Sequence, residues 1–158
     1  MTTSLVPFDM RPGGYSFAEA RAFLTALSTE GAEFYVNVQQ RLDIAYPALI
    51  TLTLFLSIAA MAPRLIGQWR WVMAAFALPI AIFDYLENHA IAAMIETGAA
   101  GLTQELVAAA SQWTILKSNV TMVAMTILLI VLAVRLGSFV IRIARSVRSQ
   151  RVESPDAA

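Results

Sequence analysis

Three long apolar runs, separated by short polar segments, dominate the pattern of hydrophobic and polar positions along the chain. They cover residues 42–62, 71–95 and 113–134. Each run has about 20 residues or more, the length that an α-helix needs to cross about 30 Å of hydrocarbon. The pattern therefore predicts an all-α fold, a bundle of three membrane-spanning helices within residues 32–135.

The segment before the first run divides into two parts. Residues 1–15 are rich in proline and glycine and predict an irregular lead-in. Ser16 and Glu19 then match a capping box, and apolar residues follow at helical spacing. We predict an amphipathic helix over 16–30, ended by Gly31. We expect it to lie at the membrane surface or to cover the end of the bundle, and a helix packed on a soluble partner is the alternative.

Proline and glycine residues divide the runs further. Pro47 has no N–H group, so the carbonyl of Asp43 loses its usual helical partner, and a polar side chain of a neighbouring helix could replace it. Pro79 should kink the second span. Residues 98–101 (GAAG) predict a turn, and Thr103 is a candidate N-cap for the last helix.

A basic tail, residues 136–158, follows the third run. Arginine occurs at every third position, with apolar residues between: Arg142, Arg145, Arg148 and Arg151. This spacing predicts a basic, amphipathic helical tail. We expect these arginines to bind the surface of an anionic membrane, and a helix that docks on a protein is the alternative.

The distribution of basic residues predicts the orientation. Arg64 and Arg70 lie in the loop between the first two spans, and the tail is basic, whereas residues 96–112 contain no basic residue. By the positive-inside rule the C-terminus should be cytoplasmic and the N-terminal segment periplasmic. The preference for arginine over lysine, with abundant alanine, suggests a bacterial source and therefore the inner membrane.

The composition agrees with a membrane protein and narrows its chemistry. The chain is 58% hydrophobic and 14% charged, against about 45–50% and about 25% in soluble domains. The formal net charge of zero argues against nucleic acid as a partner. The absence of cysteine excludes disulfides, thiolate zinc sites and iron–sulfur clusters.

Ionisable groups within the predicted spans are the strongest functional signal. Asp84, Glu87 and Asn88 share one face of the second span, and Lys117 lies at a similar depth on the third. Charged groups in hydrocarbon are costly when unpaired. We therefore expect Lys117 to pair with Asp84 or Glu87 in the outer half of the membrane, close to Asp43 on the first span.

The predicted polar cluster extends over three inward-facing stripes. Its members are Asp43, Tyr46, Asp84, Glu87, Asn88, Trp113, Lys117 and Thr121. A structural ion pair that fixes helix register and a functional site remain equally open. Two carboxylates facing one ammonium group leave excess negative charge, so we expect one acid to bind a proton. No set of metal ligands is predicted.

The favoured function is a lipid- or small-molecule-binding module, or an accessory subunit of a membrane complex. Membrane lipids, a larger membrane protein or a second copy are the expected partners, and no cofactor is indicated. The alternative is an intramembrane enzyme in which Asp84 and Glu87 act as acid and base, with Lys117 or His89 as the electrophilic group. Proton or cation translocation is a third hypothesis, which the apolar inner halves of the spans disfavour.

Two short motifs carry a resemblance. Residues 42–47 (LDIAYP) and 84–88 (DYLEN), with Tyr15 and Ser16 opening the amphipathic helix, resemble segments of small multi-helix bacterial integral membrane proteins. The resemblance covers residues 9–135 and implies a membrane-embedded helical fold, with no activity attached.

Overall fold

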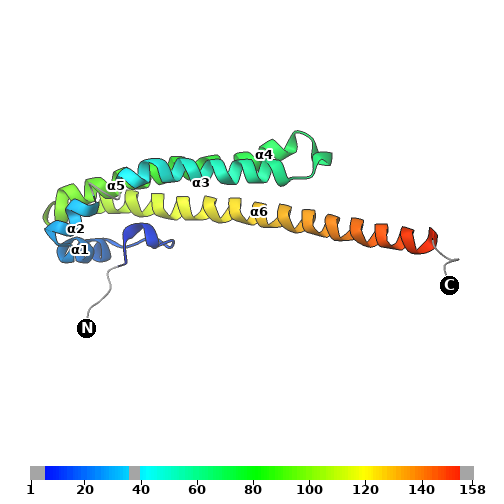
Figure 1. Ribbon diagram of the computed structural model, residues 1–158. Coiled ribbons are helices and arrows are strands. Elements are labelled where there is room, and N and C mark those ends of the chain that lie inside the picture. The colour runs from blue at the N-terminus through cyan, green and yellow to red at the C-terminus, as the bar shows by residue number, and fades with distance from the viewer. Residues whose placement is uncertain (1–5, 36–39, 154–158) are drawn as a thin grey trace.

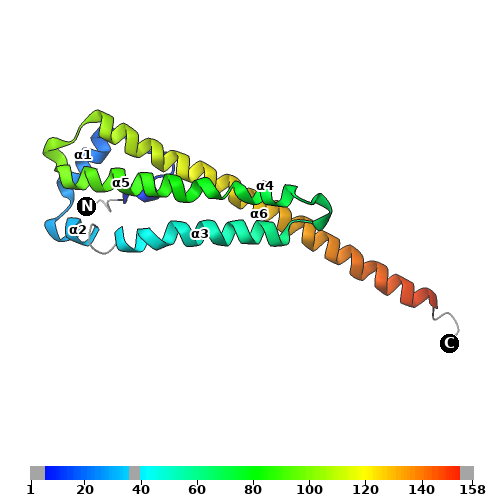
Figure 2. The ribbon, with the colours of Figure 1, turned by 90° about the horizontal axis from the view of Figure 1, so that it is seen from above.

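The computed structural model describes residues 6–35 and 40–153, and over these residues the chain is helical without strands. The elements in chain order are η1 (Phe8–Met10), α1 (Phe17–Ala26), α2 (Thr29–Phe34), α3 (Gln40–Met61), η3 (Arg64–Ile66), α4 (Trp69–Ala75), α5 (Leu78–Gly101) and α6 (Gln104–Glu153). Helix α3 and the α4–α5 pair run beside α6 to form an elongated bundle, with α1 and α2 at one end (Figures 1 and 2).

Three stretches of the described chain are long and apolar enough to cross a membrane: Leu42–Met61, Trp69–Gly101 and Gln104–Arg148. Within the most apolar 18 residues of each stretch, only 28%, 22% and 11%, respectively, is buried inside the molecule. Large apolar side chains therefore cover the outside of the bundle, in contrast to soluble monomers, where extended apolar patches are rare. This surface is compatible with a multi-pass membrane protein.

The predicted kink at Pro79 is confirmed, and the helix is interrupted there. Helix α4 ends at Ala75, and α5 begins at Leu78 with the proline in its first turn. The N–H groups of Phe76 and Ala77 donate to carbonyls three residues back, in tight turns. A proline ring fits the first turn of a helix, where its missing N–H group has no intrahelical partner to lose.

The single helix predicted over residues 16–30 is wrong, because two helices occupy this segment. Leu27 is extended, with ψ 119°, and ends α1. Ser28 then caps α2 by accepting a hydrogen bond from the N–H of Gly31, which lies inside this helix and does not end the preceding one. The capping box of Ser16 and Glu19 is confirmed, and the bonds from Ser16 lower the pKa of the Glu19 carboxyl.

The N-terminal segment packs on the end of the bundle. The ring of Phe8 packs in a tilted arrangement against those of Tyr15 and Phe23, with ring centroids 4.7 and 4.5 Å apart. These rings share one apolar cluster with Ile91 and Met94 of α5 and with residues of α6. Helix α1 therefore covers the end of the bundle, which is one of the positions predicted for the amphipathic helix.

The turn between α5 and α6 lies close to its predicted place. Gly98 has φ 69° and ψ 175°, a conformation that side chains disfavour, and it interrupts the helical geometry before Gly101. Thr103 caps the next helix, because its hydroxyl accepts a hydrogen bond from the N–H of Leu106. Helix α6 then runs unbroken through residues 104–153 and projects well beyond the other helices (Figure 1).

Apolar side chains fill the half of the bundle nearest this projection. One cluster contains Leu54, Ile80 and Ala124, and a second contains Ile58 and Ala74. The polar side chains discussed next lie in the opposite half, beneath the N-terminal segment.

Candidate functional site

A buried ion pair connects α5 and α6. The ammonium group of Lys117 pairs with Oε2 of Glu87, a side chain with an exposed fraction of 0%. The hydroxyl of Thr114, one turn before Lys117, donates to Oε1 of Glu87 at 2.6 Å. Both oxygens of this carboxylate are therefore engaged, and the predicted pairing of Lys117 with an acid of the second span is confirmed.

The second carboxylate lies at the edge of the site. Oδ1 of Asp84 is 3.9 Å from the Lys117 ammonium and accepts a hydrogen bond of 3.1 Å from Asn88. The exposed fractions of the Asp84 and Lys117 side chains are 10% and 17%. The site is therefore sealed around Glu87 and keeps only a small exposed edge at Asp84 and Lys117. We call Asp84, Glu87, Asn88, Thr114 and Lys117 the polar cluster.

Two further carboxylates surround the polar cluster. Asp43 of α3 interacts electrostatically with Lys117, Glu87 and Asp9, and Asp84 interacts with Asp43. Of the basic groups in residues 6–35 and 40–153, Lys117 is the one that interacts with both Asp43 and Asp84. Four acids from three parts of the chain thus act on one ammonium group: the predicted Asp84, Glu87 and Asp43, and in addition Asp9.

The N-terminal segment closes the site through a close backbone approach. Gly14, with φ 79°, lies so near α6 that an added Cβ would be 2.5 Å from Oγ of Ser111 and 2.8 Å from Cδ1 of Ile115. The next N–H group, of Tyr15, donates to Oγ of Ser111 at 2.9 Å. The Tyr15 hydroxyl is buried beside Thr114 and makes no hydrogen bond of ordinary geometry with the described residues. Burial raises the pKa of Tyr15 above its ordinary value.

Tyr35 and Asp9 form a second link near the site. The Tyr35 hydroxyl donates to Oδ1 of Asp9 at 3.3 Å. Burial, with the neighbouring charge of Asp9, raises the pKa of Tyr35 above its ordinary value. Asp9, Tyr15 and Tyr35 were not predicted as site residues, because the fold of the N-terminal segment brings them to the site. Ser111 of α6 was missed as well, because it bonds to Tyr15 only through that fold.

Some residues of the predicted cluster lie elsewhere. Tyr46 is exposed and does not join the polar cluster. His89, predicted only as the electrophilic group of an enzyme, is exposed too and lies off the face of Asp84, as the helical spacing implies. Trp113 stacks on Phe83 at 6.0 Å, and Thr121 is half-buried further along α6. A side chain of a neighbouring helix was expected to bond to the carbonyl of Asp43, which Pro47 leaves without its helical partner. The carbonyl that accepts such a bond is that of the next residue, Ile44, to which the Tyr85 hydroxyl donates at 2.7 Å.

The arginines of the tail lie along the projecting part of α6. The side chains of Arg142, Arg145 and Arg148 are exposed to solvent, whereas that of Arg151 lies outside the described residues. Among the described residues, no three acids, histidines or cysteines converge as ligands for a metal ion.

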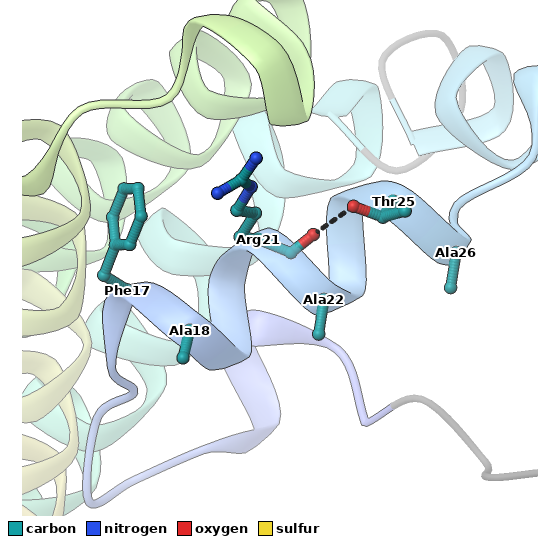
Figure 3. Close-up of a pocket in the computed structure, with 6 residues that line it drawn as sticks. All are labelled: Phe17, Ala18, Arg21, Ala22, Thr25 and Ala26. Atoms are coloured by element: carbon teal, nitrogen blue, oxygen red, sulfur yellow. Dashed lines mark hydrogen bonds between the residues drawn. The ribbon is translucent and has the colours of Figure 1, made fainter.

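A separate hollow lies on the outer face of α1 (Figure 3). Its volume is about 720 Å³, and it is lined by Phe17, Ala18, Arg21, Ala22, Thr25 and Ala26. The Thr25 hydroxyl is already bonded to the carbonyl of Arg21, at 2.7 Å. This surface comes from a single helix with small side chains, and it does not connect with the chemistry of the polar cluster.

Comparisons of the chain with models of protein families, with characterised proteins and with solved structures found no match. The class is therefore defined by the fold and the site. It is an all-helical chain with three helices long and apolar enough to span a membrane, and with a paired lysine and glutamate buried between two of them.

Proposed function

We propose that this chain is a multi-pass membrane protein that binds a lipid-soluble small molecule at the polar cluster. The apolar outer surfaces of α3, α5 and α6 support insertion, because water would be a poor solvent for them. The basic residues of the tail support a cytoplasmic C-terminus in a bacterial inner membrane.

The observation that supports a binding site here is the excess of carboxylates around Lys117. A carboxylate surrounded by other acids and removed from water is stabilised by a positive charge or a hydrogen-bond donor. Asp84 is the carboxylate of the polar cluster that keeps a small exposed edge and that Lys117 does not already saturate. We infer that the ligand has a cationic or hydrogen-bond-donating head that contacts Asp84, and an apolar body that lies against the bundle.

The arrangement favours binding over acid–base catalysis. The enzyme hypothesis needs Asp84 and Glu87 to exchange protons as an acid–base pair, whereas both oxygens of Glu87 are engaged and its side chain is fully buried. His89 is exposed and remote from the polar cluster. Translocation is also disfavoured, because apolar clusters around Ile58 and Ile80 fill the path toward the other end.

Identification of bound small molecules tests the proposal. The wild-type protein and the variant Asp84→Asn are purified in the same detergent, and organic extracts of both are compared by untargeted mass spectrometry. We expect a cationic or amine-bearing lipid-soluble compound with the wild type, and at least about tenfold less with the variant. The amide still accepts the bond from Asn88 and leaves the pair of Lys117 with Glu87 in place, so the fold should persist.

Glu96→Gln is the matched control, since it removes an exposed carboxylate on the same helix. It should retain the compound at the wild-type level. Equal amounts in wild type and Asp84→Asn, or extracts that contain only bulk lipid, would show that the polar cluster has a structural role alone.

A further inference from the structure

A groove with basic walls lies at the end of the bundle opposite the polar cluster. It is formed where α3 ends, where the chain turns toward α4, and where α6 passes alongside, and its volume is about 390 Å³. Its walls include Arg64, Arg135 and Arg142, with Leu65, Val134 and Phe139. We call it the arginine groove. Of these three arginines only Arg142 was among the predicted membrane-binding residues, and Arg64 and Arg135 were not.

Arg135 is fixed in position by the end of α3. Its Nη1 donates to the carbonyls of Ala60 and Met61, at 3.2 and 3.3 Å, and so stabilises carbonyl groups that lack helical partners. Both bonds use the same nitrogen, so they leave the Nε and Nη2 edge of the guanidinium group unused. Such an edge matches two oxygens of a phosphate group.

The other two arginines extend the same positive surface. Arg142 lies two helical turns after Arg135, on nearly the same face of α6, and Arg64 approaches from the turn after α3. No wall residue of the groove is acidic. The sequence has no acidic residue in 44–83 or in 106–152, the segments that build this end. An anion would therefore meet three guanidinium groups without a competing carboxylate in these segments.

The surroundings of the groove are those of a membrane interface. Trp69 and Trp71 are exposed at this end of the bundle, and the Arg70 guanidinium lies 4.9 Å from the Trp71 ring centroid. Exposed tryptophan and arginine together are typical of the boundary between hydrocarbon and water. Leu65 and Phe139 are exposed apolar groups beside the arginines. The expected ligand therefore has an anionic head and a hydrocarbon body.

We propose that the arginine groove binds one anionic phospholipid, with its phosphate group between Arg64, Arg135 and Arg142 and an acyl chain along Phe139. Basic pockets between membrane helices bind anionic head groups in this way. The inference rests on membrane insertion, as proposed above, and is independent of the ligand of the polar cluster.

Native mass spectrometry of the full chain in detergent tests the groove. The protein is titrated separately with phosphatidylglycerol, with phosphatidylcholine and with glycerol 3-phosphate. We expect one phosphatidylglycerol to bind at least about tenfold more tightly than phosphatidylcholine. Glycerol 3-phosphate has the same phosphate chemistry without acyl chains, and we expect it to bind far more weakly. Equal binding of both lipids, or binding of glycerol 3-phosphate as tight as that of the lipid, would overturn the proposal.

Two double variants distinguish binding in a defined groove from attraction to the overall positive charge of this end of the molecule. Arg64→Gln with Arg142→Gln removes two wall residues and should weaken phosphatidylglycerol binding by about 10- to 30-fold, since each basic group near a membrane surface contributes several-fold. Arg70→Gln with Arg148→Gln removes the same charge outside the groove and should change binding less than about threefold. Equal losses in both would contradict a defined site. Arg135 is left unchanged because it also holds the end of α3.

Extraction of membranes with alkaline carbonate distinguishes the two proposals. If the chain stays in the membrane but shows no lipid preference, the groove is wrong and the proposed membrane location stands. If the chain is released into the wash, membrane insertion is wrong, and the lipid site is overturned with it.

Discussion

The hydroxyl of Thr114 on α6 donates a hydrogen bond of 2.6 Å to Oε1 of Glu87 on α5, and both side chains are completely buried. This bond and the ion pair with Lys117 leave no oxygen of the carboxylate without a partner. A buried carboxylate is tolerated only under such conditions. The contact therefore fixes the register of α5 against α6 and determines where the accessible edge at Asp84 lies.

Removal of the ammonium group should destabilise the bundle strongly. In Lys117→Met, the buried carboxylate of Glu87 loses its counter-charge. Breaking one side of a buried pair typically costs about 3–5 kcal/mol in the free energy of unfolding. Chemical unfolding in detergent, followed by circular dichroism, measures the loss.

A second substitution checks the origin of this effect. Adding Glu87→Gln to Lys117→Met replaces the uncompensated charge by a neutral amide and should restore part of the lost stability. Glu96→Gln, at an exposed position, should change it by less than about 0.5 kcal/mol. If the double variant is as unstable as the sum of its single changes, the two groups are not coupled.

The close approach of Gly14 to α6 predicts that Gly14→Ala releases the N-terminal segment. The positive φ disfavours a side chain, and the added methyl group would collide with Ser111 and Ile115. Faster amide hydrogen exchange throughout α1 should follow, at a cost of about 1–3 kcal/mol.

Gly13→Ala is the matched control for this effect, because a Cβ at Gly13 meets nothing within 4 Å. Its exchange pattern should equal that of the wild type. Similar exchange in both variants would mean that the approach at Gly14 does not hold the segment.

Burial of Tyr15 predicts a loss of stability in alkaline solution. Burial raises the pKa of Tyr15, so the folded state favours the neutral phenol more than the unfolded state does. The resulting stabilisation is fully present below the unfolded-state pKa of about 10 and is lost as the pH rises above it. Unfolding of the wild type between pH 8 and 11 should therefore show a steeper decline than unfolding of Tyr15→Phe.

The phenylalanine variant keeps the ring packing against Phe8 and removes only a buried hydroxyl that makes no hydrogen bond of ordinary geometry with the described residues. Its stability near pH 7 should therefore match the wild type. Tyr46→Phe, at an exposed ring, is the control. Identical pH profiles for the wild type and Tyr15→Phe would show that the phenol ionises without cost to the fold.

The sequence was sufficient to predict the helical class and the pairing of Lys117, because helix periodicity alone places Asp84, Glu87 and Asn88 on one face. The high cost of unpaired charge then requires a basic partner at similar depth. The same reasoning predicted that Tyr46 faces inward on α3, and this prediction is wrong because Tyr46 is exposed. Apolar groups at Pro47, Leu54 and Ile58 face inward instead, which turns the tyrosine ring outward.

The closure of the site could not be read from local patterns. The helix predicted over 16–30 breaks at Leu27 because Ser28 is a competent N-cap, and two caps twelve residues apart compete with one continuous helix. The contribution of Tyr15 depends on contact with Ser111, 96 positions later. Such contacts arise from tertiary packing and have no periodic signature in the sequence.

The central claim is that Lys117 is held in a persistent ion pair with the buried carboxylate of Glu87, and the lysine side chain can be observed directly. Lys117 is the only lysine of the chain, so labelling with lysine enriched in ¹⁵N at Nζ gives a single ammonium signal in nuclear magnetic resonance. We predict a signal that exchanges slowly with water, that changes strongly in Glu87→Gln, and that changes less in Asp84→Asn. A signal in rapid exchange with water that is unaffected by Glu87→Gln would contradict the account.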